Sequence, residues 1–176
     1  MIHGRFQPFH NGHLEYLTAA AARCRTLYVG ITNPDRLRVR PEPDDPLRHL
    51  PESNPFTYIE RLLMVSAAAD EAGAGPVTVI PFPVTEPELW DDYVPPGAVQ
   101  YLRLFSPWGA AKLERFRARG YPTELLEAPG GKRVSGAEVR EAMRAGGDWR
   151  RLVPQAVAQV IDALPARGAL APPHPA

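Results

Sequence analysis

The sequence has one cysteine, Cys24, only two lysines, and no apolar run close to the length that crosses a membrane. A single cysteine cannot form a disulfide within the chain. A membrane-spanning helix needs about 20 consecutive apolar residues, so we expect no membrane partner. The first five residues, MIHGR, also lack the basic region and apolar run of a secretory signal. The sequence therefore predicts a cytoplasmic protein.

Excess charge of either sign is also missing, because 20 Lys and Arg are balanced by 20 Asp and Glu. A broad positive field that would attract nucleic acid is not indicated, and we expect no nucleic-acid partner. The length of 176 residues suits one domain with its own core. We place this domain at residues 1–164 and interpret the Pro- and Ala-rich residues 165–176 as a disordered tail.

Short β-rich apolar runs alternate with longer helical stretches, which is typical of a parallel sheet covered by helices. The expected strands are residues 1–4, 26–31, 77–81, 99–105 and 123–127, and the expected helices are residues 11–24, 57–72, 109–119, 135–145 and 154–164. Residues 33–54 contain five prolines and predict a long loop. We therefore expect an α/β fold with a five-stranded parallel sheet, flanking helices and a helical C-terminal end.

The most specific pattern is GRFQPFHNGH at residues 4–13, where the first strand passes into the first helix. Ligands of open parallel sheets bind at this edge. A helix start offers free N–H groups and a positive dipole end, and His10 and His13 can both face an anion there. Gly12 leaves room for phosphate oxygens to approach the backbone. The pattern predicts an anion site.

The segment Ser135-Gly136-Ala137-Glu138 has the form of a capping box, so it predicts a second helix start. Ser135 can cap this helix and still offer its hydroxyl or N–H group to a phosphate. Arg140, one turn further along, supplies a cation.

The run at residues 4–13 resembles the signature of the nucleotidylyltransferase superfamily that includes archaeal-type nicotinamide mononucleotide adenylyltransferases. The likeness continues through residues 54–61, 80–81, 134–140 and 148–154, and through Trp90. It implies a Rossmann-like fold of the HUP type. It also implies transfer of a nucleoside monophosphate from a nucleoside triphosphate to a small phosphate-bearing acceptor, with release of pyrophosphate and with ATP and nicotinamide mononucleotide as first-choice substrates.

The resemblance and the chemistry of the side chains together assign three groups of site residues. The expected catalytic residues are Arg5, His10, His13 and Arg140, which neutralise the triphosphate and the transition-state charge. The expected nucleotide-binding residues are Gly4, Phe6, Gln7, Gly12, Ser135 and Gly136. The expected acceptor-binding residues are Asn33, Trp90 and Trp108, with Trp90 stacking on a planar ring. Because no carboxylate cluster is visible, we assign no protein metal ligand and expect Mg²⁺ to be held by the substrate.

Two strand ends depart from the family pattern, and these bear on the substrate. Thr32-Asn33-Pro34 and Ser106-Pro107-Trp108 replace the short polar turns of the archaeal enzymes. Ser53 stands where the family often has an arginine, for which Arg48 is a candidate substitute. Two alternatives therefore stay open: a cytidylyltransferase that acts with CTP on a small phosphonate or phosphate, and a non-catalytic nucleotide-sensing module. The oligomeric state is also open, and a homo-oligomer is compatible with the sequence.

Overall fold

The structure is a computed structural model that describes residues 1–36, 38–41, 46–47, 49–131 and 133–165. The expectations for Arg48 and for the tail from residue 166 onward lie outside the described residues.

Parallel strands alternate with helices, as the sequence predicts. The strands are β1 (Ile2–Gly4), β2 (Leu27–Thr32), β3 (Val77–Phe82), β4 (Gln100–Leu102) and β5 (Thr123–Leu125). The helices are α1 (Asn11–Ala21), α2 (Tyr58–Glu71), α3 (Pro107–Ala118), α4 (Gly136–Arg144) and α5 (Gln155–Asp162). Three short 3₁₀ helices are η1 (Pro51–Ser53), η2 (Pro87–Asp92) and η3 (Arg150–Leu152). No helix in the described ranges has the length and apolar character needed to cross a bilayer.

The expected single five-stranded sheet is wrong in its continuity, because the strands form two parallel ladders, β1-β2-β3 and β4-β5. The ladders meet at Met1, whose N-terminal ammonium donates to the Val99 carbonyl at 2.6 Å and whose carbonyl accepts from the Tyr101 N–H at 2.9 Å. Beyond this point the Tyr16 hydroxyl donates to the Tyr101 carbonyl and is hydrogen-bonded by the His3 N–H. A side-chain hydroxyl thus takes the place of the next ladder bond, and β1 and β4 separate.

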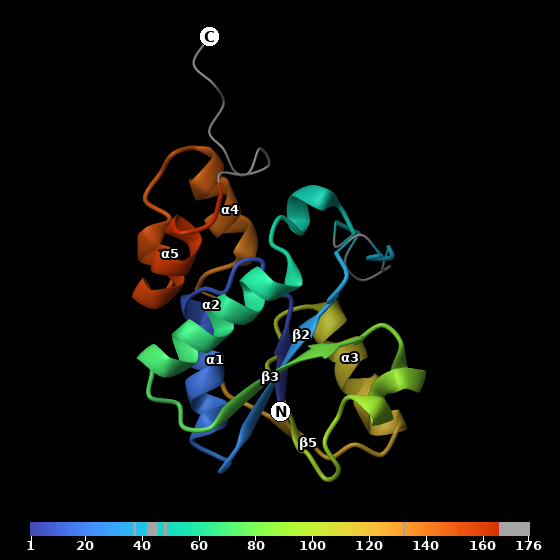
Figure 1. The fold of residues 1–176 in the computed structure, drawn as a ribbon. Coiled ribbons are helices and arrows are strands. Elements are labelled where there is room, and N and C mark those ends of the chain that lie inside the picture. The colour runs from blue at the N-terminus through green and yellow to red at the C-terminus, as the bar shows by residue number, and fades with distance from the viewer. Residues whose placement is uncertain (37, 42–45, 48, 132, 166–176) are drawn as a thin grey trace.

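Helices cover both faces of the strands, with α1, α2 and α5 on one side and α3 on the other (Figure 1). Each face has its own cluster of buried apolar side chains, and each fully buried one contributes about 1.5–3 kcal/mol. Fully buried members of the first cluster include Ile2, Leu17, Met64 and Val157. Fully buried members of the second cluster include Phe82, Trp90, Leu102 and Phe116.

The helix starts follow from side-chain caps. Both predicted capping boxes form: the Thr57 hydroxyl accepts from the Glu60 N–H at 3.4 Å, and the Ser135 hydroxyl accepts from the Glu138 N–H at 3.2 Å. Ser106 caps α3 by accepting from the Gly109 N–H at 3.4 Å. This cap explains why α3 begins two residues before the predicted start at residue 109.

Candidate active site

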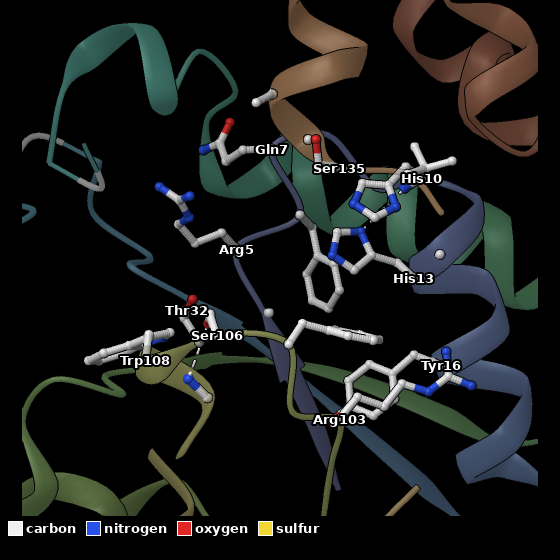
Figure 2. A pocket seen from close by; sticks show the side chains of 18 of the residues that line it. Arg5, Gln7, His10, His13, Tyr16, Thr32, Arg103, Ser106, Trp108 and Ser135 are labelled. Carbon is white, nitrogen blue, oxygen red and sulfur yellow. Dashed lines mark hydrogen bonds between the residues drawn. The ribbon is translucent and has the colours of Figure 1, made fainter. Parts of the chain in front are cut away.

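A cavity of about 330 Å³ lies where the carboxyl ends of β1, β2 and β4 meet the N-termini of α1, α3 and α4 (Figure 2). This volume lies in the range of about 300–1,000 Å³ that is usual for small-molecule sites. The separation of β1 from β4 places the cavity at the point where the strand order reverses, which is where open α/β sheets bind ligands. The predicted site residues that line it are Gly4, Arg5, Phe6, Gln7, His10, Gly12, His13, Trp108, Ser135, Gly136 and Arg140.

The two histidines of the motif stack on each other at the start of α1, with ring centroids 3.6 Å apart. His13 Nδ1 accepts a hydrogen bond from the His10 backbone N–H at 3.3 Å. Because Nδ1 acts as an acceptor, the proton of the neutral His13 ring is on Nε2. The edge of His13 also packs against the Phe6 ring at 4.9 Å. The helix cap therefore fixes both the orientation and the tautomer of His13.

The glycines of the motif make room for rings. A Cβ atom on Gly12 would lie 3.3 Å from Cε1 and Nδ1 of His10, and one on Gly4 would lie 2.8 Å from Cε1 of Phe6. Gly12 therefore preserves the position of the His10 ring, in addition to the phosphate access that the sequence suggests. Phe6 adopts a positive φ of 51°, which is uncommon for a residue with a bulky side chain, and such strained residues cluster at functional sites.

Two of the predicted site residues, Gln7 and Arg140, have hydrogen-bond partners within the protein. Gln7 Nε2 donates to the Phe56 carbonyl and Gln7 Oε1 accepts from the Phe56 N–H, both at 2.8 Å, so its amide joins the motif loop to the start of α2. Both amide atoms are engaged in this contact, and because Gln7 still lines the cavity its nucleotide-binding role stays a prediction. Arg140 Nη1 donates to the Gln7 carbonyl at 2.6 Å, which joins α4 to the same loop. A Cβ on Gly136 would approach that carbonyl to 3.0 Å, so Gly136 permits the close contact.

The wall of the cavity is strongly positive, although the chain is neutral. Among the described residues, the cationic side chains that line it are Arg5, Arg103, Lys112, Arg133 and Arg140, and Glu15 is the one carboxylate. Clefts lined by charge of one sign concentrate ligands of the opposite sign. The helix starts at Asn11 and Gly136 add backbone N–H groups and positive dipole ends. The arrangement suits a polyphosphate.

A family model described as cytidylyltransferase-like matches residues 1–93, which is more than half of the chain. The chain belongs to the cytidylyltransferase-like family. A phosphonoformate cytidylyltransferase of Streptomyces viridochromogenes is 50% identical over 163 residues, which cover 92% of this chain and 89% of that protein. A nicotinamide-nucleotide adenylyltransferase of Picrophilus torridus is 31% identical and covers 93% of this chain and 89% of its own length. The predicted resemblance to nucleotidylyltransferases is confirmed, and the chain is a nucleotidyltransferase.

The fold agrees with this family. A crystal structure of a bifunctional NMN adenylyltransferase/ADP ribose pyrophosphatase from Francisella tularensis, complexed with AMP and a manganese ion, matches with a TM-score of 0.57 at 15% sequence identity. The match covers 92% of this chain and 51% of that chain, so this chain spans about half the length of the bifunctional protein. The α/β Rossmann-like class is confirmed.

Two predicted acceptor-binding residues of this cytidylyltransferase-like chain do not line the cavity. Trp90 is fully buried, stacks on Phe116 at 4.3 Å between ring centroids, and donates through Nε1 to the Pro83 carbonyl at 3.0 Å. Because no part of its ring is exposed, the stacking role expected for it is corrected to a core role. Asn33 is buried in a left-handed conformation (φ 51°), and its carbonyl accepts from Arg61. Its side chain is not among those that line the cavity, and the acceptor role expected for it stays a prediction.

Trp108, the third predicted acceptor residue, does line the cavity. It lies in the first turn of α3, on the same side of His13 as Arg5 and Thr32 (Figure 2). The Arg115 guanidinium lies over its ring, 4.9 Å from the centroid. This cation–π contact restricts the ring and supports it from one side.

Arg61 was assigned no role from the sequence, yet it joins the strand ends below the cavity. Its side chain is fully buried and donates to five carbonyl oxygens, those of Arg5, Thr32, Asn33, Pro34 and Thr57, at 2.8–3.2 Å. Burial lowers its pKa to about 10. The Glu60-Arg61 pair belongs to a segment that resembles the family, but only the fold shows that one guanidinium holds the ends of β1 and β2. Arg103, Lys112 and Arg133 were likewise missed, because no local pattern marks them as cavity residues.

Proposed function

We propose that this nucleotidyltransferase transfers cytidine monophosphate from CTP to a small phosphonate acceptor and releases pyrophosphate. The observation that carries the proposal is the 50% identity, over 92% of the chain, with a protein named as a phosphonoformate cytidylyltransferase. The positive cavity supports it, because both substrates are anions and five cations oppose one carboxylate among the described lining residues. The relatives named as nicotinamide-nucleotide adenylyltransferases are more distant, at 28–33% identity.

The chemistry needs no covalent intermediate on the protein. An acceptor oxyanion attacks the α-phosphorus of CTP, a new P–O bond forms, and the bond from the α-phosphorus to the bridging oxygen breaks as pyrophosphate leaves. The protein has to align the two substrates and to stabilise charge on the phosphate oxygens. We assign the α-phosphate to the Nε2–H of His13 and to His10, and the β- and γ-phosphates to the start of α4 at Ser135 and to Arg140.

A magnesium ion is expected from this class of reaction, and the cavity offers it few protein ligands. Within the described residues no group of three or more His, Cys, Asp or Glu side chains could hold a metal ion, and Glu15 is the one carboxylate on the cavity wall. We therefore propose that the ion is held mainly by the phosphate oxygens of the substrate and that it neutralises their charge when bound. A cytoplasmic location, the single-domain boundary at residue 164 and a homo-oligomeric state stay predictions of the sequence.

The burial of Trp90 favours the phosphonate over nicotinamide mononucleotide as acceptor. A ring that is fully covered and hydrogen-bonded to a backbone carbonyl does not offer a face on which nicotinamide could stack. A small phosphonate needs cations and hydrogen-bond donors instead. Arg5, Thr32 and the N-terminus of α3 at Ser106 supply these together on one side of the cavity (Figure 2).

The test is pyrophosphate release across ATP, CTP, GTP and UTP, each paired with phosphonoformate, other small phosphonates, small phosphates and nicotinamide mononucleotide. Turnover that is fastest with CTP and a phosphonate is the expected result. Turnover that is fastest with ATP and the mononucleotide would replace the proposal by the adenylyltransferase reading. Nucleotide binding without turnover in any pairing would favour a nucleotide sensor.

A further inference from the structure

Arg103 and Glu15 form an ion pair on the cavity wall. Arg103 thus differs from the other cations of the wall in having a carboxylate of the same wall beside it. The Arg103 side chain is only 8% exposed, whereas that of Glu15 is 48% exposed. Arg103 Nη1 lies 3.8 Å from Glu15 Oε2, and Nη2 donates to the Glu15 carbonyl at 3.3 Å. Its guanidinium also lies 5.7 Å from the centroid of the Tyr16 ring.

The hydrogen-bonding capacity of Arg103 is incomplete in this arrangement. Nε is buried and, within the part of the chain that the structure describes, has no acceptor. The ion pair at 3.8 Å is longer than a charge-assisted hydrogen bond of about 2.7–2.9 Å. A buried donor without an acceptor is costly, so a ligand that brings acceptor atoms to Arg103 gains affinity.

The charge of the pair decides which kind of ligand fits. An anion that approaches Arg103 would also approach the Glu15 carboxylate, which repels it. A neutral group with a hydrogen-bond acceptor beside a donor satisfies both side chains, because the guanidinium only donates and the carboxylate only accepts. The nucleoside is the neutral part of the substrates in the proposed reaction.

The position of the pair agrees with this assignment. Glu15 and Tyr16 follow Gly12 by three and four residues on α1, so they extend the same helix face by about 5 Å beyond the proposed phosphate site. Arg103 directly follows β4, beside the separation between β1 and β4. Arg103 and Tyr16 lie on one side of His13, and Arg5, Thr32, Ser106 and Trp108 lie on the other (Figure 2). A nucleoside on the first side leaves the second for the acceptor.

We propose that Arg103 and Glu15 are specificity-determining residues that bind the nucleoside of the nucleotide substrate. Arg103 donates to a hydrogen-bond acceptor of the nucleoside, and Glu15 accepts from a hydrogen-bond donor beside it. The cytosine edge offers this pattern, since O2 and N3 accept and the 4-amino group donates to a carboxylate. Uracil has a carbonyl in place of the amino group, and this carbonyl cannot donate to the Glu15 carboxylate. The ribose hydroxyls are the second source of the same chemistry, because an acidic side chain can accept from them. The assignment rests on the proposed function for the identity of the nucleotide.

The test is the dissociation constant of CTP, UTP and dCTP for the intact protein, measured by calorimetry, together with KM for CTP and for the acceptor. Glu15→Gln is informative because the side chain is half exposed, so its replacement does not threaten the core. Arg103→Lys keeps the charge and loses the planar fork. We expect each variant to weaken CTP binding about tenfold, as for the loss of one good bidentate contact, with the acceptor KM unchanged. Loss of discrimination against UTP assigns the contact to the base, and loss of discrimination against dCTP assigns it to the ribose.

The matched control is the exposed pair Arg117 and Glu114 on α3, which lies outside the cavity lining with 3.0 Å between Nη1 and Oε1. Glu114→Gln and Arg117→Lys should leave all three dissociation constants unchanged. The proposal is overturned if both cavity variants bind CTP as the unaltered protein does, if they change only the acceptor KM, or if Glu15→Gln changes the Mg²⁺ dependence while CTP binding is unchanged. Failure of the unaltered protein to turn over CTP would count against the proposed function and not against this pair, because the binding measurement needs no turnover.

Discussion

Replacement of Tyr16 by phenylalanine is expected to destabilise the fold more than the loss of one exposed hydroxyl would suggest. The hydroxyl donates to the Tyr101 carbonyl and is hydrogen-bonded by the His3 N–H, so its removal leaves two backbone groups of neighbouring strands without this partner. Each buried group left unsatisfied costs about 1–3 kcal/mol. Because His3 lines the cavity and water there can replace part of the loss, we expect about 2–4 kcal/mol in total.

The assay is thermal and urea unfolding followed by circular dichroism. For a chain of this size each kcal/mol shifts Tm by about 2–4 °C, so Tyr16→Phe should lower Tm by about 5–15 °C. Tyr93, which is 37% exposed, supplies the control, and Tyr93→Phe should leave Tm nearly unchanged. The pKa of Tyr16 is raised by burial, which keeps its hydroxyl protonated, so the difference between the variants should persist throughout the neutral range. Equal Tm values for Tyr16→Phe and the unaltered protein would refute the strand-bridging role.

Further changes test the site and the core. His13→Ala should lower kcat by about 100-fold or more, as for the loss of other preorganised donors, and a nearly unchanged rate in a turnover assay would remove its assigned role. Gly12→Ala should lower kcat about tenfold with little change in Tm, because the new Cβ would lie 3.3 Å from the His10 ring and misplaced groups lose rate steeply. Trp90→Phe should lower the free energy of unfolding by about 1–3 kcal/mol and leave the acceptor KM unchanged; a raised KM would return Trp90 to the acceptor site. The pKa of Tyr121 is raised to about 12 by burial and by its hydrogen bond to Asp91, so its stabilisation should be present below pH 10 and be lost as the pH rises to about 12. Urea unfolding of Tyr121→Phe across this range should show a smaller loss than the unaltered protein, because Tyr58 and Tyr101, whose pKa values burial also raises, remain. A loss of equal size would assign the pH dependence to those groups.

The elements of the fold were largely predictable because their signals are local. Capping boxes at Thr57 and Ser135 mark the starts of α2 and α4, and the apolar runs that became β2 and β3 were placed to within one residue at each end. The continuity of the sheet was not predictable. Whether β4 pairs fully with β1 depends on the hydroxyl of Tyr16, which lies on α1, far from β4 in the sequence. No residue pattern within the two strands indicates this contact.

The position of the site could be predicted from the sequence, but the roles of several of its residues could not. Helix starts fix where His10, His13 and Ser135 must lie, and these side chains do line one cavity. The hydrogen-bonding and packing partners of a side chain often come from distant segments. The sequence could therefore not show that Gln7 hydrogen-bonds to Phe56 or that Trp90 packs on Phe116. The irregular, proline-rich segment around Trp90 is equally compatible with an exposed tryptophan that stacks on a ligand and with a buried core tryptophan.

The five bonds of Arg61 have a consequence for how this enzyme can diversify. Every one of its partners is a main-chain oxygen, and three of these oxygens belong to Thr32, Asn33 and Pro34, so the contact depends on the path of the backbone at the end of β2. Substitutions that keep this backbone path, as at Thr32, which lines the cavity, can then change the cavity surface while the ends of β1 and β2 stay anchored. The position of the strand ends that Arg61 holds is thereby separated from the identity of the side chains on the cavity wall.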